Sequence, residues 1–157
     1  MARPVRVMII TDVWVSGNAK TKGSMEIINK ATGAMKESVI GSSQWRALMA
    51  SAVRDDIAMR QPPVAELRSP WPGPVAVTVL AYLAPPQRGL FHWPIWSQAG
   101  DLDKLVRNVL DALGSTSRNP RMNGGAIVDD NLVCRIVAEK YSAEGLRAGV
   151  QIKVETL

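Results

Sequence analysis

The chain has 157 residues, 46% of them hydrophobic, and its 19 lysines and arginines exceed its 14 aspartates and glutamates by a formal net charge of +5. This length and apolar content exclude a disordered chain and predict one domain over residues 1–157. No apolar run is long enough to span a bilayer, one cysteine excludes an internal disulfide, and one histidine beside it excludes a zinc site of Cys and His ligands.

The charge is unevenly distributed, since residues 1–100 carry the basic excess and residues 101–157 are balanced. A basic surface suits nucleic acid, but many small proteins are equally basic for solubility alone. The amino-terminal residues lack a signal-peptide cleavage site, so we expect a cytoplasmic protein without a membrane segment. Any bound metal must be held by oxygen ligands, as magnesium, manganese and calcium are.

The first part of the chain predicts three strands. Val5–Ile10 is rich in β-formers and predicts a strand, and residues 16–24 form a polar segment after it. Met25–Ile28 and Met35–Ile40 predict two short strands of a hairpin around the loop Asn29–Gly33.

A helix follows, which Ser42 or Ser43 can cap and which Pro62 and Pro63 end. Its apolar residues recur at steps of three and four, as on one helical face: Trp45, Leu48, Met49, Ala52, Val53 and Ile57. The mostly apolar run Val75–Leu83 then predicts a central strand.

The second helix starts at Asp101 and ends at Gly114. Its apolar positions again follow one face: Leu102, Leu105, Val106, Val109, Leu110 and Leu113. Leu132–Tyr141 predicts a strand in which Cys134 is a core residue. Leu146–Leu157 alternates apolar and polar residues, as a strand with one buried face does.

This order of elements predicts the fold class. Strand pairs that form hairpins imply a mostly antiparallel sheet, with the two main helices packed on one face. The sequence therefore predicts a single α+β domain.

Two pairs of carboxylates are the most informative residues of the chain. Asp101 and Asp103 lie at a helix start, where the two side chains can converge and where the helix dipole favours their charge. Asp129 and Asp130 precede a strand and point to opposite faces of an extended chain, so at most one of them joins such a site. Each has a structural alternative: a helix cap, an ion pair with Arg107, or a turn.

The segment Gly100–Leu113 resembles the signature of RusA-type Holliday-junction resolvases. That family has an Asp-x-Asp-Asn-Leu-x-Lys helix start and an Asp-Ala-Leu helix end. A loop then leads to a hydrophobic pair, an Asp-Asp pair and a strand ending in lysine. Residues 126–133 and Lys140 fit this second part. Within residues 100–140 the chain departs at Lys104, which replaces the family asparagine, and at Arg107, which replaces the family lysine.

The resemblance implies a metal-dependent endodeoxyribonuclease that resolves four-way junctions by paired nicks in DNA recombination and repair. The cofactor would be Mg²⁺, with Mn²⁺ possible, and the enzyme would act as a homodimer on branched DNA. Asp101, Asp103 and Asp130 are then the direct metal ligands, and Asp129 is an outer ligand or positioning group. Arg107 is the catalytic positive charge. Two alternatives stay open: a catalytically idle DNA-binding module of the same fold, and a nuclease for other branched DNA.

Further residues are candidates for DNA contacts, each with a structural alternative. Lys20 and Lys22, in a Lys-Thr-Lys-Gly-Ser segment, could grip phosphate or belong to a solvated loop. Lys104 and Lys140 are further positively charged residues within the segments that resemble the family signature. For the remaining candidates we expect packing or strand-edge roles in preference to base stacking or DNA contact. They are Trp71, Trp93, Trp96, His92 and Arg135.

Overall fold

The structure, a computed structural model, describes residues 6–23, 25–37, 41–60, 69–86, 93–144 and 147–157. Two helices and six strands account for most of the regular structure of these residues. In chain order they are β1 (Ile9–Ser16), β2 (Met25–Asn29), β3 (Ala34–Glu37), α1 (Ser42–Arg60), β4 (Val75–Leu83), α2 (Leu102–Leu113), β5 (Val133–Ser142) and β6 (Gly149–Thr156). Three short 3₁₀ helices are η1 (Ser97–Ala99), η2 (Pro120–Met122) and η3 (Asp130–Leu132).

The main sheet has four strands in the order β1-β6-β4-β5. Strand β6 pairs antiparallel with both β1 and β4, whereas β4 and β5 are parallel. The fold is therefore α+β with a mostly antiparallel sheet, as predicted. Strands β5 and β6 are consecutive in sequence but do not pair, because the more apolar β4 lies between them and β5 takes the edge.

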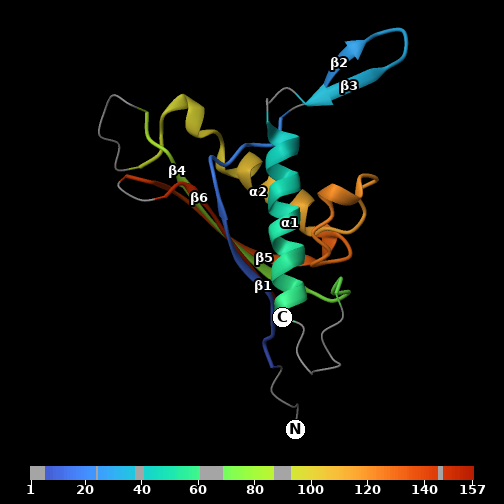
Figure 1. The fold of residues 1–157 in the computed structure, drawn as a ribbon, viewed down its shortest axis with the longest axis vertical. Helices are drawn as coiled ribbons and strands as arrows, with labels where there is room; N and C mark the ends of the chain where they lie inside the picture. The colour runs from blue at the N-terminus through green and yellow to red at the C-terminus, as the bar shows by residue number, and fades with distance from the viewer. Residues whose placement is uncertain (1–5, 24, 38–40, 61–68, 87–92, 145–146) are drawn as a thin grey trace.

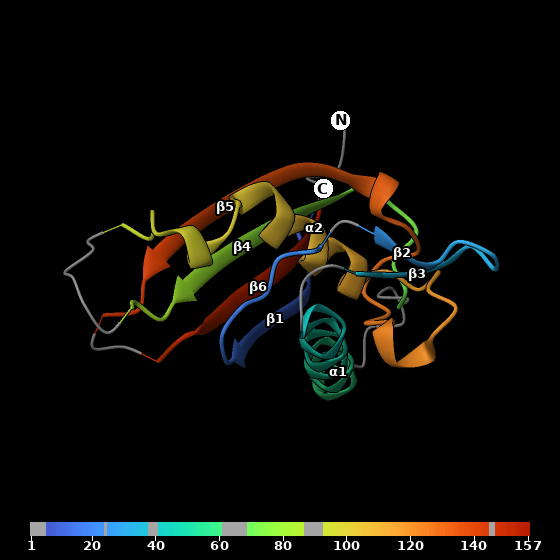
Figure 2. The same ribbon diagram turned by 90° about the horizontal axis from the view of Figure 1, so that it is seen from above.

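The core lies between one face of this sheet and the two helices (Figures 1 and 2). Alternate residues of β4 and β6 point into it, and both helices contribute their apolar faces. Each fully buried aliphatic side chain contributes about 1.5–3 kcal/mol. The largest fully buried residues are Ile10, Met49, Leu113, Ile127, Ile152, Val53, Val75, Val77, Val79, Val109, Val150 and Val154.

The first strand differs from its prediction. It begins at Ile9 and continues to Ser16 because it pairs with β6 along that length, from Ile9 opposite Glu155 to Ser16 opposite Gly149. Sheet pairing, which the local sequence does not reveal, sets this boundary. The predicted hairpin is confirmed as β2 and β3, which pair antiparallel and project beyond the start of α1 (Figure 1).

The prediction that Cys134 is a core residue is wrong. It lies exposed on β5, and Ile136 on the same strand is 46% exposed. The apolar composition of this strand suggested burial, but an edge position leaves much of it accessible.

Some predictions fall outside the described residues: the strand residue Val5, Ser24, residues 38–40 of the hairpin, the helix stop at Pro62 and Pro63, His92, and Leu146. Among the helices that the structure does describe, none is long and apolar enough to cross a membrane.

Candidate active site

The start of α2 displays the first carboxylate pair. Asp101 is the residue before the helix, and its backbone oxygen accepts the hydrogen bond from Leu105 N at 3.1 Å. Its side chain makes no cap hydrogen bond, and instead its Oδ2 lies 2.9 Å from Lys104 Nζ. The hydrogen bond and charge of Lys104 lower the pKa of Asp101. Asp103, in the first turn, is exposed at the end of the helix where the dipole favours negative charge.

The second pair lies at η3. Asp129 precedes this 3₁₀ turn, and its Oδ1 accepts a hydrogen bond from the Asn131 N–H at 3.0 Å. Asp130 is the first residue of η3 and is exposed. Although Asp130 is exposed, partial desolvation of its carboxyl group raises its pKa, and the hydrogen bond and charge of Asp129 and the charge of Asp111 raise it further. Asp130 therefore lies where negative charge is already concentrated.

One member of each pair faces a shared hollow. Asp103 and Asp130 line it together with Arg107, one helical turn after Asp103. Its volume is about 430 Å³ and its remaining lining is apolar: Leu102, Val106, Leu110 and Ala138. The other two members, Asp101 and Asp129, have the local partners Lys104 and Asn131 N–H. The structure thus divides both pairs into one locally bonded carboxylate and one that faces the hollow.

In the described part of the chain, Arg107 does not form the ion pairs with Asp103 or Asp111 that the four-residue spacing along the helix would allow. Among the residues that the structure describes, no ion pair joins Arg107 to Asp103 or Asp111. Asp111 pairs instead with Lys22, whose Nζ lies 2.5 Å from its Oδ2. The guanidinium of Arg107 is exposed at the hollow and can meet an anion there.

The hollow offers oxygen ligands of the kind that Mg²⁺ prefers, two carboxylates with open room for waters and phosphate. Across the described part of the chain, no three Asp, Glu, His or Cys side chains are close enough to hold one ion. Asp101, which the sequence groups with Asp103 and Asp130, lies against Lys104. A cation held by all three carboxylates would have to displace Lys104 from Asp101. The carboxylates of Asp103 and Asp130, which both line the hollow, have donor chemistry that fits a divalent cation.

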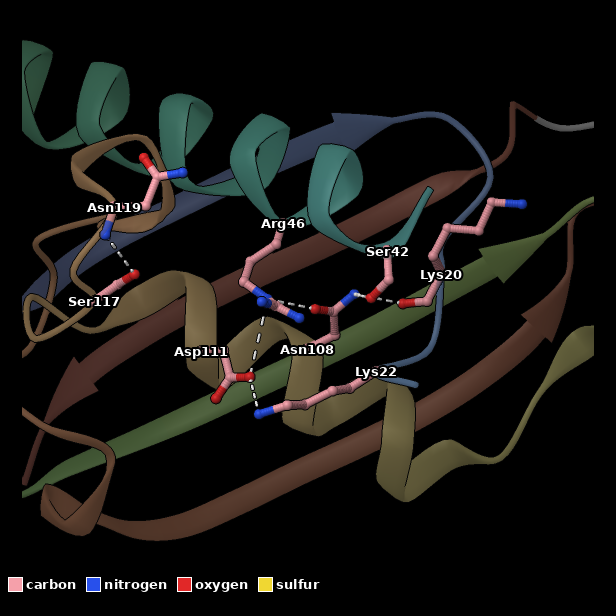
Figure 3. Close-up of polar contacts among 8 residues, drawn as sticks. All are labelled: Lys20, Lys22, Ser42, Arg46, Asn108, Asp111, Ser117 and Asn119. Carbon is pink, nitrogen blue, oxygen red and sulfur yellow. Dashed lines mark hydrogen bonds and ion pairs between the residues drawn. The ribbon is translucent and has the colours of Figure 1, made fainter. Parts of the chain in front are cut away.

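The four lysines expected to contact DNA lie around α2. Lys22 reaches Asp111, and Lys104 reaches Asp101. Lys140, on β5, donates a hydrogen bond from Nζ to the Gly100 oxygen at 2.8 Å, beside the start of α2. Lys20 is exposed, and its side chain extends away from α2 in Figure 3.

Three functional candidates near this site escaped the sequence reasoning: Arg46 on α1, and Asn108 and Asp111 on α2. Arg46 and Asp111 line a second hollow of about 260 Å³ that also includes Asp130. Asn108 is fully buried and hydrogen-bonds with the Arg46 side chain (Figure 3). A polar residue on the core-facing side of an amphipathic helix was the available signal.

The tryptophans have packing roles in the structure. Trp71 and Trp96 are half-buried against the core. Trp93 is 54% exposed and stacks on Tyr141 of β5, with ring centroids 5.9 Å apart. Arg135 is exposed on the same edge strand.

Comparison with known protein families gives one assignment. A model of the family described as Endodeoxyribonuclease RusA matches residues 41–155 of the 157-residue chain. The match runs from the start of α1 through β6 and includes both carboxylate pairs. A search of curated proteins finds no match. The chain belongs to the RusA family of endodeoxyribonucleases.

Proposed function

We propose that this endonuclease resolves four-way DNA junctions with the help of a divalent cation, by paired nicks during recombination and repair. The observation that supports the proposal most directly is the shared hollow, where Asp103, Asp130 and Arg107 face one another from α2 and η3. Carboxylates and an arginine around one opening combine metal ligands with an anion partner, which is what phosphodiester cleavage needs.

A bound Mg²⁺, or Mn²⁺, would activate the attacking water and neutralise the phosphate. In this chain Asp103 and Asp130, which line the hollow, would hold the cation, and Asp101, now paired with Lys104, would be the third ligand. Asp129 orients η3 through its hydrogen bond to Asn131 N–H and so positions Asp130.

Arg107 supplies a fixed positive charge beside the scissile phosphate. Because an arginine does not lose its proton in a protein, it acts by electrostatic stabilisation and not by donating a proton. The family pattern has lysine here, for which both roles are available. The substitution therefore selects the electrostatic role in this chain.

Lys20, Lys22, Lys104 and Lys140 bind the DNA backbone around this hollow. The net charge of +5 supports a junction affinity that falls steeply with salt, because neutralised phosphates release their counterions. A homodimer, with one site in each subunit, would match the approximate two-fold symmetry of a four-way junction and give paired incisions.

A panel of end-labelled substrates tests the proposal. Four-way junction, flap and linear duplex of matched sequence are incubated with and without Mg²⁺, and the cut positions are mapped. The expected result is a pair of symmetric nicks in the junction only with metal. Preferential cutting of flaps would make the chain a nuclease for another branch. Binding of the junction without cutting, both with and without Mg²⁺, would make it an idle module of the same fold.

A further inference from the structure

A buried amide on α2 joins three parts of the molecule. The Asn108 side chain is fully buried, and its Nδ2 donates to the Lys20 backbone oxygen at 2.8 Å and to Ser42 Oγ at 3.4 Å. Its Oδ1 accepts from Arg46 Nε at 2.8 Å (Figure 3). Burying a carboxamide costs free energy unless its hydrogen bonds are satisfied, and here both ends of the amide have partners.

These bonds anchor a segment that has no regular structure of its own. Residues 17–23 follow β1 without forming a helix or strand, so side-chain and loop contacts must set their path. Besides the Asn108 bond, Lys22 N donates to the Lys104 backbone oxygen at 3.1 Å. The ion pair of Lys22 with Asp111 adds a third attachment to α2.

The anchored segment is attached to α2 near both hollows. Lys104, which accepts the backbone bond from Lys22, directly follows Asp103 in the first turn of α2. Asp111, which holds the Lys22 side chain, lines the second hollow together with Asp130. The backbone at Lys20 and the ammonium group of Lys22 are therefore fixed against α2, while the exposed Lys20 side chain extends away from the helix (Figure 3).

We propose that Asn108 is a positioning residue for DNA binding: its amide pre-organises segment 17–23 so that Lys20 and Lys22 meet the DNA backbone. This inference rests on the proposed function. Holding the segment in place before DNA arrives removes an ordering cost from binding, which raises affinity without any new contact to DNA. The residue itself is buried and touches no substrate.

A double-mutant cycle tests the proposal. Junction affinity is measured by fluorescence anisotropy over a salt series, in metal-free buffer, for wild type, Asn108→Ala, the double variant K20A/K22A, and the triple variant. Asn108→Ala should weaken binding about tenfold, the equivalent of one hydrogen bond. It should also lower the slope of log affinity against log salt by about 1, as the loss of one phosphate contact does.

In the K20A/K22A background, Asn108→Ala should change affinity by less than about twofold, because coupled residues are not additive. At saturating junction in Mg²⁺, Asn108→Ala should keep the wild-type cleavage rate while its KM rises. The proposal would be overturned if Asn108→Ala bound the junction with wild-type affinity. It would also be overturned if the affinity loss of the triple variant equalled the product of the losses of Asn108→Ala and K20A/K22A.

Two further variants separate anchoring from stability. Asn108→Asp has the same size and can still accept from Arg46, and it can accept from the Ser42 hydroxyl to which Asn108 donates, but it cannot donate to the Lys20 oxygen. It should repeat the affinity loss even if Asn108→Ala fails to fold. Ile152 is fully buried on β6, so Ile152→Val lowers stability without altering residues 17–23. This variant should bind the junction with unchanged affinity. Wild-type protein that fails to bind the junction would overturn the proposed function itself, and only this arm reports on it.

Discussion

Carboxylates in two regions of this molecule have opposite surroundings. Asp56 lies in the seam between α1 and β1, where it accepts hydrogen bonds from Thr11 Oγ1 at 2.7 Å and Asp12 N at 2.9 Å and pairs with Arg60 at 2.7 Å. Asp103 and Asp130 instead line an open hollow between α2 and η3. The partners of Asp56 are all part of the protein, whereas the hollow is open to partners from outside.

The direction of each pKa shift expresses the same contrast. Burial raises the pKa of Asp56, but the hydrogen bonds from Arg60, Thr11 and Asp12 outweigh it, and the net shift is downward. For Asp130, burial and the neighbouring carboxylates Asp129 and Asp111 all act upward. The seam stabilises a negative charge, while the hollow concentrates negative charge that a cation would relieve.

The largest effect is expected from replacing the carboxylates of the proposed metal site. Asp103→Asn, Asp130→Asn and Asp101→Asn should each reduce junction cleavage below detection. Each change replaces a negatively charged ligand of the metal with a neutral amide. Junction binding and the melting temperature should stay near wild type, since the basic surface and the core are untouched. A gel-based cleavage assay with anisotropy binding checks this.

The matched control is Asp55→Asn, an exposed carboxylate on α1 that should cut normally. Full activity in any one of the three site variants would remove that residue from the proposed site.

The next effect concerns the charge beside the carboxylates. Arg107→Ala should slow cleavage about 10²-fold or more, the size typical of losing one transition-state stabilising group. Arg107→Lys should keep much of the rate, because a lysine also supplies positive charge. Single-turnover rates at saturating junction measure both. An Arg107→Ala protein that cuts at the wild-type rate would contradict the electrostatic role, and Lys104 would be the next residue to test.

Asp56→Asn should show the reverse pattern and leave the cleavage rate of folded protein unchanged. It should lower the free energy of unfolding by about 2 kcal/mol, as expected for lost hydrogen bonds to a charged group. That corresponds to a fall of about 4–8 °C in melting temperature for a chain of this size.

Because the pKa of Asp56 is lowered in the folded state, its contribution is present above the pKa of the unfolded chain. It is lost as pH falls through the lower folded pKa. Thermal melts over an acidic pH series should therefore show a shallower decline for Asp56→Asn than for wild type. Parallel declines would mean that Asp56 does not contribute in this way.

The smallest effect is expected from Asp129→Asn, which keeps an oxygen that can accept from Asn131 N–H. Removing this charge should reduce cleavage about tenfold, the lower end of the range for changes behind direct metal ligands. Cleavage rates of Asp129→Asn and Asp130→Asn, measured side by side, check the difference. Equal losses would show that both carboxylates bind the cation directly.

Local patterns were sufficient to predict much of the fold. The bounds of β4 and most of the apolar faces of both helices follow from short-range periodicity. Leu48, which periodicity placed on the buried face of α1, is 49% exposed. The start of β1 and the exposure of Cys134 depend on which strand neighbours which, and this information lies in pairing across the whole chain. The placement of β4 between β5 and β6 has the same origin.

A motif led to part of the proposed site. Asp103, Arg107 and Asp130 came from the family resemblance, and in the structure all three line one hollow. The local bond of Asp101 to Lys104 was not predictable, because a helix start allows several partners for one carboxylate. Asn108 was missed because its role depends on Lys20, 88 residues earlier.

The most direct test of the account compares three proteins on one substrate. Wild type, Asp103→Asn and Asp56→Asn are incubated with labelled four-way junction, with Mg²⁺ or with EDTA, at a temperature where all three are folded. The account predicts that wild type and Asp56→Asn cut only with Mg²⁺ and that Asp103→Asn cuts in neither. Cleavage by wild type in EDTA, or by Asp103→Asn at the wild-type rate, would contradict it.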